Sequence, residues 1–227
     1  MAWWHTSFDA WVPEVRNFYV SRLCSDARFP DANRLLMEFE KCVDVWHGNR
    51  NRSAKRGVQE KVNELAAAEA LVSSMAEDQT LHYELPLIGT KQTIDFLVKS
   101  ATGLVGWIDV KTVDPKWQDT EIYRERFEKV REHAPQGVRT MLSREWGGAG
   151  FASQKLNACK TFVRNTIEIE KKAAGLDSTQ RAPVAILFCT YGFAWKWDAL
   201  EDFADFYRTG SFRTVFIFWR KEGRGKR

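Results

Sequence analysis

The chain contains the stretch Thr93-Ile94-Asp95-Phe96-Leu97-Val98-Lys99-Ser100-Ala101-Thr102-Gly103-Leu104-Val105-Gly106-Trp107-Ile108-Asp109-Val110-Lys111-Thr112. Residues 93–99 and 104–112 are rich in β-branched and aromatic side chains, which is typical of strands. Residues 100–103 between them are small or polar and end in glycine, which is typical of a tight turn. The stretch therefore predicts an antiparallel β-hairpin.

The hairpin brings two carboxylates together. The expected register pairs Lys99 with Val105, Leu97 with Trp107 and Asp95 with Asp109. Residues paired in this way have Cβ atoms roughly 5 Å apart, and like charges so close destabilise a sheet unless a positive group lies beside them. Lys111 is two residues from Asp109 and projects from the same face of its strand. Two facing carboxylates with an ammonium beside them predict a site for a hard divalent cation.

A less specific interpretation also fits these residues. Asp95 and Asp109 could be solvated residues on an exposed hairpin face, with Lys111 as their ion-pair partner. The apolar residues on both sides of each Asp favour the other interpretation, in which the pair is embedded in a core strand.

The composition is that of an ordinary globular protein, with 44% hydrophobic and 28% charged residues over 227 positions. That length allows one substantial hydrophobic core. No apolar run approaches the ~20 residues that span a bilayer, and no secretory signal is visible, so no membrane partner is expected. The four cysteines form no C-x-x-C pair, which argues against a structural zinc site or a disulfide framework and fits a cytoplasmic location.

Basic residues are clustered, although the net charge is only +4. One cluster comprises Arg50, Arg52, Lys55 and Arg56. A second lies at the C-terminus, from Arg220 to Arg227. Such clusters suit the phosphate backbone of a nucleic acid, and basic tails also serve solubility. The first cluster is the predicted nucleic-acid-binding surface.

Periodicity elsewhere predicts helices at 8–47, with a break near Pro30, and at 58–76, 121–133, 152–174 and 197–207. Strands are predicted at 83–88, 184–189 and 214–219, and a polar linker at 48–53. This order predicts an α/β (α+β mixed) fold in which a central mixed sheet is flanked by helices. Residues 1–50 would form a helical extension, and residues 51–227 the core with a basic C-terminal tail.

An acid-bearing helix, a strand carrying Asp and a neighbouring strand reading acid-x-Lys resemble the PD-(D/E)XK (restriction endonuclease-like) nuclease superfamily. The resemblance covers residues 58–112, extends more loosely to 219, and does not include residues 1–50. Asp95 matches the metal-binding Asp of the first motif, and Asp109 and Lys111 match the acid and the lysine of the second. Ile94 stands where the family name has proline.

The resemblance implies a restriction-endonuclease-like core and a Mg²⁺- or Mn²⁺-dependent nuclease, with a DNA endonuclease as the leading expectation. Asp95 and Asp109 would bind the metal, with the Val110 carbonyl as a further ligand. Lys111, with its pKa depressed beside the metal, would orient or deprotonate the attacking water or steady the scissile phosphate.

Family members often place another acidic ligand on the helix before the strands. Val58, Val62, Leu65 and Val72 form an apolar stripe, and Glu69 falls near its centre. A carboxylate that faces the core needs a partner, which a metal would provide. Glu69 is therefore the predicted third acid and Glu64 its reserve.

Other members of the superfamily suggest two accessory residues, Gln154 at the start of the 152–174 helix and His47 before the basic linker. The alternatives to a DNA endonuclease are an RNA endonuclease, of the cap-snatching or toxin kind, and a non-catalytic nucleic-acid-binding or assembly protein on the same fold. The tryptophan-rich N-terminal helices could pair two chains in a homodimer.

Overall fold

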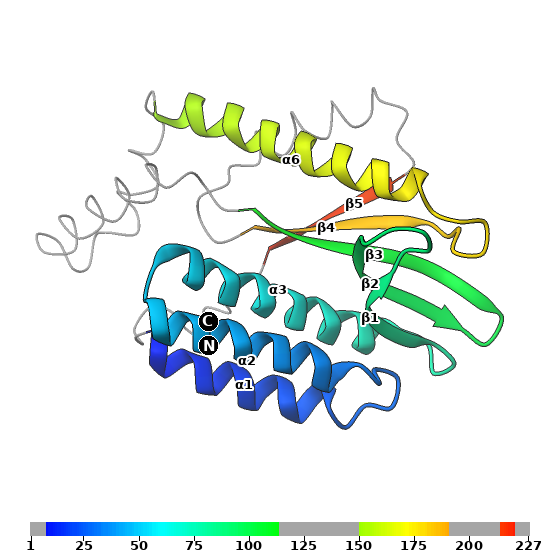
Figure 1. Ribbon diagram of the computed structural model, residues 1–227, viewed down its shortest axis with the longest axis horizontal. Helices are drawn as coiled ribbons and strands as arrows, with labels where there is room; N and C mark the ends of the chain where they lie inside the picture. The colour runs from blue at the N-terminus through cyan, green and yellow to red at the C-terminus, as the bar shows by residue number, and fades with distance from the viewer. Residues whose placement is uncertain (1–7, 114–149, 191–213, 221–227) are drawn as a thin grey trace, which may run out of the picture.

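The structure is a computed structural model that describes the backbone of residues 8–113, 150–190 and 214–220 (Figure 1). The described elements are α1 (Phe8–Leu23), α2 (Ala32–Asn49), α3 (Arg52–Ser74), β1 (Thr80–Pro86), β2 (Thr93–Ser100), β3 (Gly103–Val113), α6 (Gly150–Ala174), β4 (Val184–Thr190) and β5 (Thr214–Arg220). The helices predicted at 121–133 and 197–207 lie outside the described residues.

The described strands form one sheet in the order β1-β2-β3-β4-β5. β1, β2 and β3 pair antiparallel, whereas β4 is parallel to both β3 and β5. Helix α3 lies on one face of the sheet with α1 and α2 beyond it, and α6 lies on the other face (Figure 1). The prediction of a mixed α/β fold with a central mixed sheet is confirmed at this level.

Each face of the sheet buries its own hydrophobic cluster. On the α3 side, Phe96, Val98 and Val110 pack with residues of α1, α2 and α3. On the α6 side, Trp107 packs with Phe162 and other apolar residues of α6 and β4. Because side chains alternate along a strand, Asp109 and Lys111 share the parity of Trp107, whereas Val110 has the opposite parity. The two charged residues therefore belong to the side of β3 that α6 covers.

The connection between α1 and α2 covers the outer edge of β1. The Leu81 N–H donates to the Arg28 carbonyl at 2.7 Å, and the Tyr83 N–H donates to Asp31 Oδ2 at 3.0 Å. These bonds occupy backbone donors that an edge strand would otherwise leave open. Residues 8–49 are thus tied to the sheet at β1, and α1 and α2 also share the hydrophobic cluster of α3.

The observed hairpin agrees with the predicted register at Leu97–Trp107 and differs nearer the turn. Lys99 pairs with Leu104 rather than with Val105, because the register shifts by a β-bulge that leaves Val105 without a partner. The turn closes with Ser100 opposite Gly103, whose φ of +140° is a conformation that a residue with a Cβ rarely adopts.

The predicted linker at 48–53 is shorter than expected. Helix α2 continues to Asn49 and α3 begins at Arg52, so only two residues separate them. Arg50 ends α2 in the left-handed conformation, with φ of 49°. Asn51 then caps α3, since its side chain accepts a hydrogen bond from the Ala54 N–H at 2.9 Å. The basic stretch is therefore a tight corner between two packed helices.

Replacing the capping residue of α3 tests this corner. We expect Asn51→Ala to lower the free energy of unfolding by about 1 kcal/mol, because the Ala54 N–H loses its acceptor. In a chain of this size, that corresponds to a fall in Tm of about 2–4 °C. Asn49→Ala, in the last turn of α2, is the matched control and should change stability by less than about 0.5 kcal/mol. Equal stability of the two variants would contradict the capping role.

Candidate functional site

The two predicted acids lie where the β2–β3 ladder ends. The last paired residues are Phe96 and Ile108, and beyond them Asp95 Oδ2 accepts a hydrogen bond from the Val110 N–H at 2.6 Å. The Asp109 side chain is only 1% exposed. The interpretation of Asp109 as a solvated residue on an open face is therefore wrong, and the carboxylate needs compensating charge.

Two lysines supply that charge, one from each side. Lys111 Nζ lies 2.6 Å from Asp109 Oδ2, and Lys172 Nζ, from α6, lies 3.6 Å from Asp109 Oδ1. Lys172 also donates to the Thr93 carbonyl at 3.1 Å. Glu168, one helical turn before Lys172, lies 3.8 Å from Lys172 Nζ and 4.0 Å from Lys111 Nζ. The cluster thus joins β2, β3 and α6.

The electrostatics of this cluster raise the pKa of both Asp95 and Lys111. Burial raises the pKa of Asp95 well above its usual range, and the charges of Asp109 and Glu64 raise it further. Burial alone would lower the pKa of Lys111, but the charge of Asp109 and the hydrogen bond with it outweigh burial and raise that pKa. The depressed pKa expected for Lys111 applies to a site that holds a cation and stays a prediction; without the cation, Asp109 holds the ammonium.

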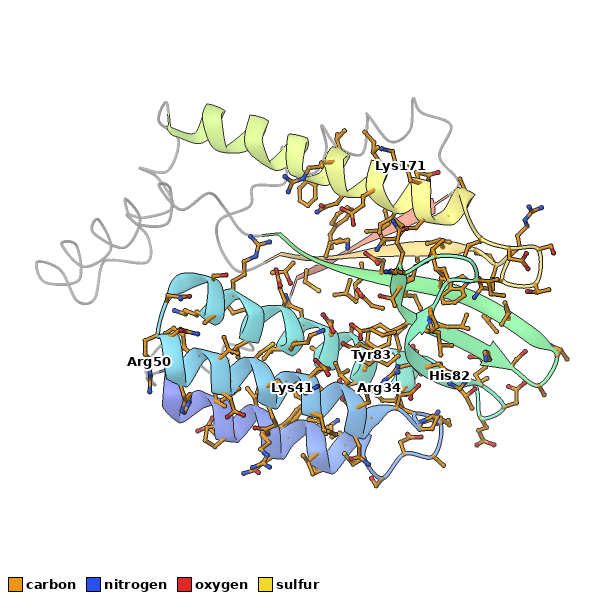
Figure 2. All side chains as sticks on the ribbon, in the orientation of Figure 1. Arg34, Lys41, Arg50, His82, Tyr83 and Lys171 are labelled. Atoms are coloured by element: carbon orange, nitrogen blue, oxygen red, sulfur yellow. The ribbon has the colours of Figure 1, made fainter. Side chains whose placement is uncertain are left out.

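The third acid near this cluster is Glu64, which the sequence suggested as the alternative to Glu69. Glu64 is 8% exposed, and its Oε2 accepts hydrogen bonds from the Tyr83 hydroxyl and from Lys61 Nζ, each at 2.8 Å. Burial raises the pKa of Glu64, and its charge contributes to the raised pKa of Asp95. Figure 2 shows Tyr83 between α3 and the sheet, where it joins the helix to β1.

Glu69 faces a different neighbour. Its Oε1 pairs with Arg22 of α1 at 2.9 Å, and its side chain is 25% exposed. Glu64 and Glu69 are five residues apart, which places them about 140° apart around a helix of 3.6 residues per turn. Asn63 and Glu64, on another side of α3, hydrogen-bond to Thr112 of β3 and Tyr83 of β1. The structure therefore brings Glu64, not Glu69, towards Asp95.

The carboxylates of Asp95, Asp109 and Glu64 are ligands of the kind that a hard cation prefers, but the three do not converge on one point. Within residues 8–113, 150–190 and 214–220, no three His, Cys, Asp or Glu side chains converge closely enough to hold a metal. Apart from the ammonium groups of Lys111 and Lys172, the buried oxygens of Asp109 have no hydrogen-bond partner there. Carboxylates crowded in this way, one of them with a raised pKa, fit Mg²⁺ or Mn²⁺ in place of an ammonium.

The predicted accessory residues lie away from the acids. Gln154 is in the first turns of α6, 18 positions before Lys172, which is about 27 Å along the helix axis at 1.5 Å per residue. His47 is exposed in the last turn of α2, and α3 lies between α2 and the sheet (Figure 1). The Val110 carbonyl stays a predicted metal ligand. The N–H of the same residue donates a hydrogen bond to Asp95.

The basic residues gather at the α2–α3 corner. Figure 2 shows Arg50 there, with its guanidinium 5.4 Å from the centre of the Trp46 ring. Arg52 is the first residue of α3, and the exposed Lys55 and Arg56 follow within its first turns. Arg56 Nε also pairs with Glu60 at 2.7 Å. The predicted nucleic-acid-binding residues therefore share one corner of the molecule. The end of the C-terminal cluster lies outside the described residues.

Comparison with known proteins gives no match to a family model, to a curated protein or to a solved structure. In the described part of the chain, every helix is too short or too polar to cross a lipid bilayer.

Sequence reasoning missed Lys172, Glu168, Lys61 and Tyr83. Lys172 lies 61 positions after Lys111 in the chain, and only the packing of α6 on β3 brings the two together. The i, i+4 spacing of Glu168 and Lys172 was visible in the sequence, but such pairs are common on solvated helix faces. Lys61 and Glu64 are spaced i, i+3, and their burial against Tyr83 depends equally on tertiary packing.

The crowding of acids predicts that Asp95→Asn stabilises the cation-free protein. Because the pKa of Asp95 is raised in the folded state, the folded protein loses stability as pH rises above about 3.9, where the unfolded carboxyl ionises. An amide keeps an acceptor for the Val110 N–H without that cost. In EDTA at pH 7.5, we expect the Tm of Asp95→Asn to exceed that of wild type by about 2–4 °C, which corresponds to about 1 kcal/mol in the free energy of unfolding. This difference should shrink as the pH falls towards 4.

Asp44→Asn, on the exposed face of α2, is the matched control and should leave Tm unchanged at both pH values. A fall in Tm for Asp95→Asn at pH 7.5 would show that the charge of Asp95 stabilises the fold, contrary to this account.

Proposed function

We propose that this protein is a metal-dependent nuclease that hydrolyses phosphodiester bonds, most plausibly a DNA endonuclease of the PD-(D/E)XK type. The observation that carries the proposal is the grouping of Asp95 and Asp109 on adjacent strands with Lys111 beside Asp109. The order of α3, β1, β2 and β3 and the buried Glu64 on α3 give further support. Together they supply the helix acid, the strand Asp and the acid-x-Lys of that superfamily.

Each residue has a role that follows from its chemistry. Asp95 and Asp109 would hold Mg²⁺ or Mn²⁺, which supplies an acidified water and stabilises charge on the phosphate oxygens. Glu64 would serve as the third acid. To bind the cation, it would give up its hydrogen bond with Lys61 or with Tyr83. Lys111, displaced from Asp109, would orient the attacking water or the scissile phosphate.

The basic corner supports a nucleic acid as substrate. Arg50, Arg52, Lys55 and Arg56 concentrate positive charge in a chain whose net charge is only +4. Phosphate contacts of this kind provide affinity without sequence recognition. The corner would therefore hold the backbone of the substrate while the acids act on one phosphate.

A non-catalytic nucleic-acid-binding protein is the second candidate. The observation that favours it is that Asp109 already has two cationic partners, Lys111 and Lys172. Buried ion pairs of this kind can be purely structural. In that case the hairpin would be scaffold, and binding to nucleic acid would need no divalent cation.

Cleavage of supercoiled plasmid tests the proposal directly. We expect nicking or linearisation with Mg²⁺ or Mn²⁺ and none with EDTA. Lys111→Ala should lower the rate at least about 100-fold, the usual contribution of a group that transfers or positions a proton. Lys91→Ala, an exposed lysine in the β1–β2 connection, is the matched control and should cleave like wild type.

The other results separate the alternatives. Cation-dependent degradation of single-stranded RNA, with no plasmid cleavage, would establish the RNA endonuclease. Equal activity of Lys111→Ala and wild type would contradict the assigned site. Tight DNA binding in EDTA, without cleavage of either substrate under any cation, would establish the binding protein.

The basic corner makes a separate prediction for binding. The logarithm of the binding constant falls linearly with the logarithm of the salt concentration, and removing one phosphate contact makes this negative slope shallower by about 0.9 on duplex DNA. We expect Lys55→Ala to show this change in a fluorescence anisotropy titration at several salt concentrations. Lys41→Ala, on α2 and paired with Glu38, is the control and should keep the wild-type slope. An unchanged slope for Lys55→Ala would remove Lys55 from the interface.

A further inference from the structure

Asp109 has an ammonium group at each of its oxygens, and the two groups come from different elements. Lys111 on β3 lies at Oδ2, and Lys172 on α6 lies at Oδ1. Both lysine side chains are largely buried, at 22% and 14% exposure. The only other carboxylate within 4.0 Å of both Nζ atoms, among described residues, is Glu168. Two buried cations thus share one buried anion and one anion at the surface.

The balance of charge among Lys111, Lys172, Asp109 and Glu168 depends on whether Asp109 binds a divalent cation. With Asp109 available, the two ammonium groups face two carboxylates and the cluster is balanced. If a divalent cation takes Asp95 and Asp109, the two lysines keep only Glu168 as a counter-charge. The Glu168 side chain is 54% exposed, so water screens it and its attraction is weak. A partly desolvated pair of ammonium groups then lies beside the bound cation with one positive charge in excess.

We propose that Lys172 is a second phosphate-binding residue of the site, which acts with Lys111 on the phosphate being cleaved once a divalent cation occupies Asp95 and Asp109. The inference rests on the proposed nuclease function and deepens it. An ammonium has three donors and suits a phosphate as a compact point charge. The Thr93 carbonyl takes one donor of Lys172 and fixes the side chain at the site, which leaves others for phosphate oxygens.

Lys172 could also stabilise the fold simply as a cation at the end of a helix. Lys171 and Lys172 both lie in the last turn of α6, where a cation is favourable to the helix dipole. That effect applies equally to the two lysines. Lys171, however, is exposed, and Figure 2 shows it on α6. The pair therefore provides a matched comparison, because only Lys172 reaches Asp109 and the Thr93 carbonyl.

The proposal implies an order of binding. In the cation-free protein both lysines are held by Asp109, so the site attracts a phosphate weakly. Binding of the cation frees them, and the phosphate then meets the cation and two ammonium groups together. Substrate affinity should therefore contain a cation-dependent part that needs Lys172, in addition to a cation-independent part from the basic corner.

The experiment measures fluorescence anisotropy of a labelled duplex oligonucleotide with the full chain, in Ca²⁺ to limit cleavage and in EDTA. We expect Lys172→Ala to lose about tenfold or more in affinity in Ca²⁺, the cost of one charge-assisted hydrogen bond. In EDTA it should match wild type. Lys171→Ala should match wild type in both conditions. Lys172→Arg, which keeps the charge and donors, should recover part of the affinity.

Glu168→Gln gives an independent result, because it leaves both lysines in place. Removal of the competing carboxylate should tighten binding several-fold in Ca²⁺ and change nothing in EDTA, and this holds even if Lys172→Ala fails to fold. Equal losses for Lys172→Ala and Lys171→Ala, or unchanged affinity for Glu168→Gln, would overturn the inference. Continued plasmid cleavage by wild type would then leave the nuclease proposal standing. Wild type without cation-dependent binding or cleavage would overturn both.

Discussion

The structure depends on one buried charge, the carboxylate of Asp109 in the middle of the sheet. Its strand, β3, lies between β2 and β4, and the carboxylate is only 1% exposed. A buried carboxylate must be paired or neutralised, and removing its partner leaves an uncompensated charge at large cost. Lys111 and Lys172 meet this requirement, and Lys172 ties α6 to the sheet in doing so.

A local departure from the regular sheet lies next to this carboxylate. Past Phe96 and Ile108, the Asp95 side chain, rather than a β2 carbonyl, accepts the Val110 N–H. Glu64 approaches from α3, and its hydrogen bonds to Tyr83 and Lys61 hold it at the sheet. Acids and lysines therefore lie on both sides of the central strands, with Glu64 and Lys61 on the α3 side and Asp109, Lys111 and Lys172 on the α6 side. An arrangement that only stabilised the fold could use apolar residues at lower cost, which supports the proposed role of these residues in a metal site.

Local sequence determined much of the site, and tertiary packing determined the rest. Alternation and turn residues predicted the hairpin, the Leu97–Trp107 pairing and the closeness of Asp95 to Asp109. The bulge at Val105 was not predictable, because it depends on how the turn closes. Glu69 was preferred to Glu64 because α3 is buried on two sides and periodicity does not say which side meets the sheet. Lys172 could not be assigned, since its role arises only where α6 crosses β3.

We propose that the Asp95–Asp109 pair binds a divalent cation. The most direct test is a crystal structure with Mn²⁺, in which anomalous scattering locates the ion. We expect a peak about 2 Å from an oxygen of each Asp, with Lys111 Nζ moved away from its present position 2.6 Å from Asp109 Oδ2. A structure grown in millimolar Mn²⁺ with no peak there, and with Lys111 still paired to Asp109, would contradict it.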